Sequence, residues 1–204
     1  MTEEEEAEFE REHGVPVNAG TSVIISSWGM ALGILFAAIA FATFVLSYFY
    51  LRLENPVWPP PDFAMPGFTW TLVAGALAVT SALSARAALR AVRSGDQDGF
   101  IRRLTVALLL AAGAVAIQWV DVSGYGADTS THAYGSIFAT LAGYCVALLG
   151  GAIIMGGSAL YWAIRGRYTV KRYAMVANIS RYWIAAAVMW VMGFATLYLG
   201  PYLT

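Results

Sequence analysis

Five long apolar stretches alternate with short polar or proline-rich connections along the 204-residue chain. Each stretch is long enough to cross a bilayer, since a spanning helix needs about 20 mostly apolar residues. The first has no charged residue between Gly14 and Leu51. All are uninterrupted and longer than barrel strands, so helices are the expected spanning structure. The pattern predicts an all-α, polytopic membrane protein, a bundle of five transmembrane helices at about 21–52, 68–92, 100–122, 133–164 and 177–202.

Basic residues concentrate in two of the four connections. The polar turn at 93–99 and its flanks carry five arginines, and the connection at 165–172 carries three arginines and one lysine. The other two connections carry acidic residues, with Arg52 as the only nearby cation. Cytoplasmic connections of membrane proteins are enriched in lysine and arginine. We therefore expect both basic turns in the cytoplasm, the N-terminus inside and the C-terminus outside.

Residues 1–20 differ in character from the transmembrane domain expected over 21–204. Seven of the first twelve residues are glutamates. A block of like charges repels itself and stays solvated, so we expect a disordered cytoplasmic tail; docking on a basic partner surface is the alternative. The segment is acidic where a signal or transit peptide should be basic, so membrane insertion is expected to rely on the first helix.

Composition supports the membrane class. Hydrophobic residues make up 59% of the chain and charged residues 12%, against about 25% charged in a typical soluble domain. The two histidines, His13 and His132, lie outside the predicted spans, and the single cysteine is Cys145. No span has a central carboxylate, lysine or histidine, the usual marks of proton and ion pathways. We therefore expect no catalytic, cofactor-binding or metal site in this chain and no nucleic-acid partner, whereas a carrier of neutral solutes stays open.

Seven residues at or near the predicted helix ends are candidates for contact with lipid or with another subunit. The arginines lie at interface depth, where a guanidinium group can bind a lipid phosphate. The tryptophan belongs to an aromatic belt with Tyr48, Phe49 and Tyr50 at the outer interface. The aspartate is either a solvated carboxylate or one half of an ion pair. These candidates are Arg52, Trp58, Arg86, Arg90, Arg102, Arg103 and Asp121.

Glycines mark a second kind of surface. Gly29 and Gly33 stand four residues apart on the first predicted helix, and Gly150 and Gly151 are adjacent on the fourth. Small residues let helices in a membrane approach closely. They predict either packing inside the bundle or a flat face for a partner subunit.

Four segments, taken in order, resemble subunit III of the haem–copper oxidases in its bacterial five-helix form. The first resembles that family's aromatic-Tyr-Leu-Arg helix end followed by Trp-Pro-Pro. The second resembles its polar turn and next helix, the third its Ala-Tyr-Gly-Ser helix start, and the fourth its terminal helix. The segments are SYFYLRLENPVWPPPDF (47–63), RSGDQDGFIRRLTVALLLAAGAVAIQWVDV (93–122), HAYGSIFATLAGY (132–144) and SRYWIAAAVMWVMGFATLYL (180–199).

Departures from the family pattern affect its membrane-embedded polar groups. The family usually has a glutamate midway along the first of these helices, but the residues around Ala37 are apolar. Cys145 and Leu148 stand where the family has two histidines, and Ile184 replaces a histidine of the terminal helix. The chain therefore resembles a divergent member that lacks most of this polar network.

The resemblance implies a non-catalytic component of a respiratory terminal oxidase in the bacterial inner membrane. Such a subunit packs against catalytic subunit I, accompanies subunit II and binds phospholipid, while haem and copper belong to subunit I. The sequence leaves alternatives open: an accessory subunit of a nitric oxide reductase or of a quinol oxidase, a haem-free transporter, or a scaffold of a respiratory supercomplex. In the last case the acidic tail would bind another respiratory complex.

Overall fold

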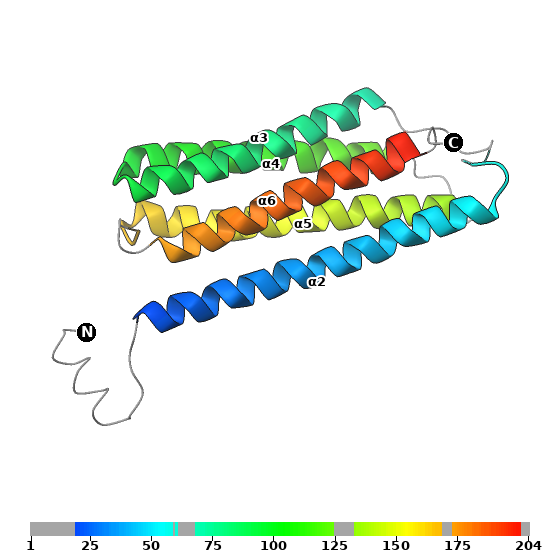
Figure 1. The fold of residues 1–204 in the computed structure, drawn as a ribbon. Coiled ribbons are helices and arrows are strands. Elements are labelled where there is room, and N and C mark those ends of the chain that lie inside the picture. Colours follow the sequence, from blue (N-terminus) through cyan, green and yellow to red (C-terminus); the bar gives the residue numbers. More distant parts are fainter. Residues whose placement is uncertain (1–18, 59, 61–67, 125–132, 169–172, 201–204) are drawn as a thin grey trace.

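The computed structural model consists of five long helices followed by a short π-helical turn (Figure 1). It describes residues 19–58, 60, 68–124, 133–168 and 173–200, so most of the expected acidic tail (1–20) lies outside the described residues. The helices are α2 (Ala19–Glu54), α3 (Phe68–Arg93), α4 (Gln97–Gly124), α5 (Ala133–Ile164) and α6 (Ala174–Phe194), and the π-helical turn is η1 (Ala195–Leu199).

All five predicted spans are present. Each of the five long helices is apolar enough and long enough to cross a membrane. The predicted all-α, five-span architecture is thereby confirmed, whereas the orientation of the termini across the membrane stays a prediction.

Two glycines end helices at the basic turns. Gly95 has φ 80° and Gly166 has φ 69°, values that glycine adopts without the steric cost of a Cβ atom. Around Gly95, the amides of Gly95 and Asp96 donate to the carbonyls of Val92 and Ala91 at 3.3 and 3.0 Å, which is the Schellman arrangement for a helix C-terminus. The next helix starts at Gln97, earlier than the expected start near 100, because the Asp96 carboxylate accepts the amide of Gly99 at 2.8 Å and caps the first turn.

Helices α3 to α6 form the body of the bundle, and α3 and α4 have the most extensive contact. Small side chains make this close approach possible, since alanines line the buried face of each helix. Ala74, Ala78 and Ala82 on α3 are 5% exposed or less, and Ala107 and Ala111 on α4 are fully buried.

Helix α2 lies along one side of this body and contacts mainly α5 and α6. Its N-terminal end lies at the same end of the bundle as the α3–α4 and α5–α6 turns (Figure 1). Large apolar side chains along α2 stay uncovered: Trp28 and Phe36 are each 67% exposed and Leu46 is 69% exposed. This helix therefore presents a long apolar face to whatever surrounds the chain.

The expected aromatic belt needs one correction. Tyr48 is completely buried inside the protein, whereas Tyr50 is 61% exposed. The Tyr48 ring packs edge-on against Phe49 and Trp58, with centroid distances of 5.4 and 5.6 Å. Tyr48 is thus a core residue near the C-terminal end of α2, because α2 turns this side chain toward the bundle.

Candidate functional site

At the end of the bundle where α2 ends, two of the seven contact candidates bind their own chain. Arg52, in the last turn of α2, donates a hydrogen bond from Nη1 to the carbonyl oxygen of Gly200, just after η1. Trp58 packs between Tyr48 and Tyr134, with ring centroids 5.6 and 4.9 Å from its own. Both residues therefore attach α2 and the following connection to the bundle.

At the opposite end, the arginines of α3 and α4 divide into two kinds. Arg103 is half-buried and donates from Nη1 to the carbonyl oxygen of Ala87 at 3.2 Å, which ties α4 to α3. Arg86, Arg90 and Arg102 are exposed. These three remain candidates for lipid or subunit contact. The last candidate, Asp121, belongs to α4 by its backbone, but its side chain lies outside the described part of the chain.

Arginines at the two basic turns lie over aromatic rings. The guanidinium carbons of Arg165 and Arg167 are 4.3 and 4.1 Å from the ring centroids of Tyr161 and Trp162, and that of Arg93 is 4.9 Å from the centroid of Tyr173. Such cation–π contacts are favourable and still leave the charged group at the surface. They hold positive charge at this end of the bundle.

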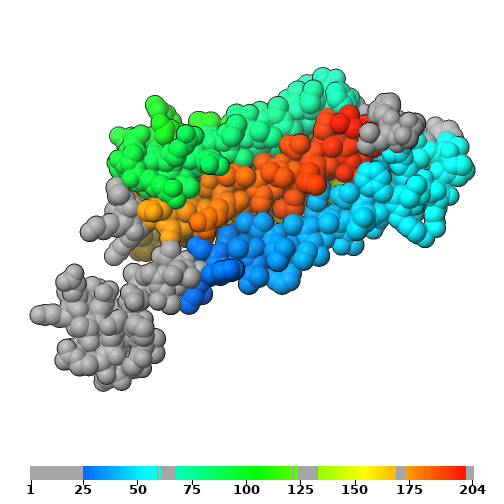
Figure 2. All heavy atoms as spheres, in the orientation of Figure 1, coloured from blue at the N-terminus to red at the C-terminus, as the bar shows by residue number. Residues whose placement is uncertain are grey.

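A groove between α3 and α6 connects an apolar surface with one of the exposed arginines. It has a volume of about 300 Å³ and is lined mainly by Val79, Leu83, Ile184 and Val188, with Arg86 also in its wall. Figure 2 shows α6, in orange to red, on the front face of the molecule between α3 in green and α2 in blue. The arrangement suits a molecule with an apolar chain and an anionic group.

A larger groove runs on the other side of α6, against α2. Its volume is about 520 Å³, and Phe41, Val45, Met189 and Met192 are among its lining residues. The lining is almost entirely apolar, so this groove favours a hydrocarbon chain or an apolar helix surface over a polar solute.

Polar side chains that sequence reasoning missed join α2 to the bundle. Asn178 on α6 is 3% exposed; its amide nitrogen donates to Ser26 at 3.0 Å and its oxygen accepts the hydroxyl of Ser27 at 3.4 Å. Arg181 also donates to the Asn178 oxygen, at 3.1 Å. An asparagine four residues into a membrane helix was the available signal, since buried amides in lipid need partners.

The glycine candidates differ in what faces them. A Cβ atom on Gly151 would lie 2.8 Å from the hydroxyl oxygen of Tyr182 on α6, so this glycine packs against another helix. A Cβ on Gly29, Gly33 or Gly150 would meet no described atom within 4 Å. Gly151 therefore faces α6, whereas the Cβ positions of Gly29, Gly33 and Gly150 are open among the described residues. Contact with a partner stays a prediction for them.

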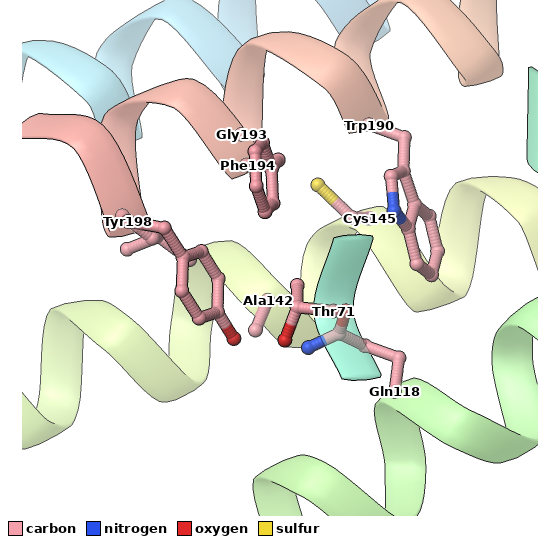
Figure 3. A pocket seen from close by; sticks show the side chains of 9 residues that line it. Thr71, Gln118, Ala142, Cys145, Trp190, Gly193, Phe194 and Tyr198 are labelled. Carbon is pink, nitrogen blue, oxygen red and sulfur yellow. The ribbon is translucent and has the colours of Figure 1, made fainter. Parts of the chain in front are cut away.

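A small cavity inside the bundle gathers several polar groups. Its volume is about 10 Å³, and its walls come from α3, α4, α5, α6 and η1. Figure 3 shows Gln118, Thr71 and Tyr198 turned toward one another, with the Cys145 thiol nearby. Gln118 is 4% exposed and Thr71 1%. Across all residues that the structure describes, no group of three or more His, Cys, Asp and Glu side chains could hold a metal ion.

The comparisons with known proteins give one family. The model of the family described as cytochrome c oxidase subunit III matches residues 3–202, which include all five helices. The comparison with curated proteins found no match. The resemblance drawn from the sequence motifs is confirmed by a match over nearly the whole chain, and the chain belongs to the cytochrome c oxidase subunit III family.

Proposed function

We propose that this chain is a non-catalytic subunit III-like component of a bacterial respiratory terminal oxidase. The complex would reduce oxygen to water and translocate protons across the inner membrane. This chain would stabilise catalytic subunit I, accompany subunit II and bind phospholipid. The observation that carries the proposal is the family match over residues 3–202, which covers the bundle from end to end.

The surface of α2 supports the proposed contact with another subunit. Much of α2 is exposed: it carries large exposed apolar residues, and the Cβ positions of Gly29 and Gly33 are open among the described residues. Exposed glycines allow a second helix to approach closely in a membrane. A partner subunit or a lipid that binds α2 would bury this exposed apolar face.

The α3–α6 groove supports lipid binding. Arg86 offers a guanidinium group that can hold a phosphate through two hydrogen bonds, and the adjoining apolar walls suit an acyl chain. In this proposal the haem and copper belong to subunit I, and this chain contributes packing and lipid contacts.

The experiment that tests the function is purification of the tagged chain from native membranes in mild detergent. We expect haem-containing subunits to co-purify, with reduced-minus-oxidised haem bands and oxygen consumption. Membranes with the untagged chain give the background. Purification of the intact chain without haem, under conditions that keep lipids bound, would contradict the proposal and favour a transporter or scaffold; nitric oxide consumption without oxygen consumption would favour a nitric oxide reductase.

Lipid binding has its own test in mass spectrometry of the same preparation. The Arg86→Gln variant should lose a bound phospholipid. Arg90 is exposed but does not line the groove, so the Arg90→Gln variant is the control and should keep the phospholipid. Equal phospholipid content in both variants would contradict a site at Arg86.

A further inference from the structure

Gln118 is a polar side chain buried in the part of the protein expected to lie within the membrane. Gln118 is 4% exposed and lines the small internal cavity. Its amide points into the cavity (Figure 3). The amide lies beside Thr71 and Tyr198, which also line the cavity. A buried amide needs hydrogen-bond partners, all the more where lipid excludes bulk water.

The cavity is the right size for one small ligand. A volume of about 10 Å³ is close to the space that a single water molecule requires. A lipid, a haem or an organic solute would not fit. The walls are also not uniformly apolar, as they would be around a dry cavity: Thr71 and Tyr198 contribute hydroxyl groups beside the amide.

We propose that this cavity binds one water molecule, held by the amide of Gln118 and the hydroxyls of Thr71 and Tyr198. Each hydroxyl can donate one hydrogen bond and accept others, so each can bind water while keeping a bond elsewhere. The amide can donate to the water or accept from it. The water gains three partners, a typical number for a buried water.

The position of the water gives it a structural role. Thr71 belongs to α3, Gln118 to α4 and Tyr198 to η1. The water therefore joins the end of the chain to the α3–α4 pair. The residues of η1 depart from regular α-helix, and single π turns inside α-helices occur frequently at functional sites. The ligand is independent of the oxidase assignment, because the site lies wholly within this chain.

The direct test is electron cryo-microscopy of the tagged protein with its co-purifying subunits, at a resolution that shows ordered water. We expect a density peak within hydrogen-bonding distance of the Gln118 amide. An empty cavity, or a cavity closed by direct contact between Gln118 and Thr71, would overturn the proposal.

A pair of variants gives an independent test through the sign of the change in Tm. If water is bound, Gln118→Leu removes one of its partners, and the Tm of the purified protein should fall. If the cavity is dry, the same change removes an unfavourable buried amide, and the Tm should rise. Ala142→Ser is the matched variant, because Ala142 lines the cavity and the added hydroxyl can take the place of the water beside Gln118. We expect it to remove the density peak and to leave the Tm nearly unchanged; a peak that persists beside Ser would count against this site.

Discussion

The hydroxyl of Tyr144 on α5 donates a hydrogen bond of 2.9 Å to the main-chain carbonyl oxygen of Ala37 on α2. Phe41 and Phe44 pack against the same tyrosine ring, with centroid distances of 6.4 and 5.3 Å. The bond lies between the Asn178 contacts at one end of α2 and the Arg52 contact at the other. Helix α2 buries little of its surface, so these three polar contacts, together with the buried rings of Phe41 and Tyr48, hold it on the bundle.

Tyr144→Phe should loosen α2 without creating a cavity. The substitution removes only the hydroxyl, and hydrogen bonds between membrane helices contribute about 0.5–2 kcal/mol. We expect a lower Tm in detergent and faster proteolysis at the connection after α2. Tyr161→Phe is the control, since Tyr161 is 50% exposed and keeps its ring beneath Arg165. Equal Tm values for the two variants would show that the Tyr144 hydroxyl does not hold α2.

Two adjacent glycines of α5 should respond in opposite ways to the same substitution. A Cβ on Gly156 would lie 2.5 Å from a ring carbon of Trp183, whereas a Cβ on Gly157 would meet nothing within 4 Å. Trp183 cannot easily move, because it is fully buried and donates from Nε1 to Ser81 at 3.0 Å. Gly156→Ala should therefore destabilise the fold by about 1–3 kcal/mol, the usual cost of overpacking.

The neighbouring substitution supplies the comparison. Gly157→Ala should be neutral or stabilising by up to about 1 kcal/mol, since alanine favours the helix over glycine. Unfolding of both variants in increasing denaturant, followed by circular dichroism, measures the difference. A Gly156→Ala protein as stable as Gly157→Ala would mean that α5 and α6 can separate without cost.

The outline of this fold follows from local sequence features. Uninterrupted apolar length predicts the five helices, and the glycines at 95 and 166 mark helix ends through a backbone conformation that needs no partner. Which face of a helix packs against a neighbouring helix is not a local feature, because it depends on residues far along the chain. Gly29 and Gly33 have the spacing of a packing motif, yet that spacing carries no information about which helix lies opposite. Among the described residues, no atom lies within 4 Å of a Cβ at either position.

Contacts between residues distant in sequence also explain why the candidate site could be predicted only in part. Arg52 has the position of a lipid-binding arginine, but its partner is the carbonyl of Gly200, which is 148 residues away. Gln118 is recognisable as a deep polar residue from sequence, whereas its neighbours Thr71 and Tyr198 belong to other elements and appear only once the bundle is assembled. The π-helical turn at η1 has no periodicity signal, since it spans only 5 residues.

Gly29→Leu and Gly33→Leu should separate the stability of this chain from its assembly with other subunits. Neither leucine would meet a described atom of the chain at its Cβ, so the isolated chain should keep its Tm. If a partner subunit covers this face of α2, less of it should co-purify with each variant. Quantitative mass spectrometry of the purified preparations measures the partner, and Gly157→Leu, open in the same sense on α5, controls for added bulk. Full recovery of the partner with both α2 variants would mean that this face meets lipid alone.

The two ends of the bundle should be reached by reagents from opposite sides of the membrane. Ser94 lies in the α3–α4 turn beside exposed arginines, and Asn55 follows the C-terminal end of α2; both are exposed. The excess of positive charge at the first end predicts a cytoplasmic location. In a Cys145→Ala background, which removes the chain's only cysteine, Asn55→Cys should react with a membrane-impermeant maleimide added to intact spheroplasts. Ser94→Cys should react only in inverted vesicles. The reverse labelling pattern would show that the predicted topology is inverted. The end of the α3–α6 groove that holds Arg86 would then lie in the outer leaflet rather than the inner one.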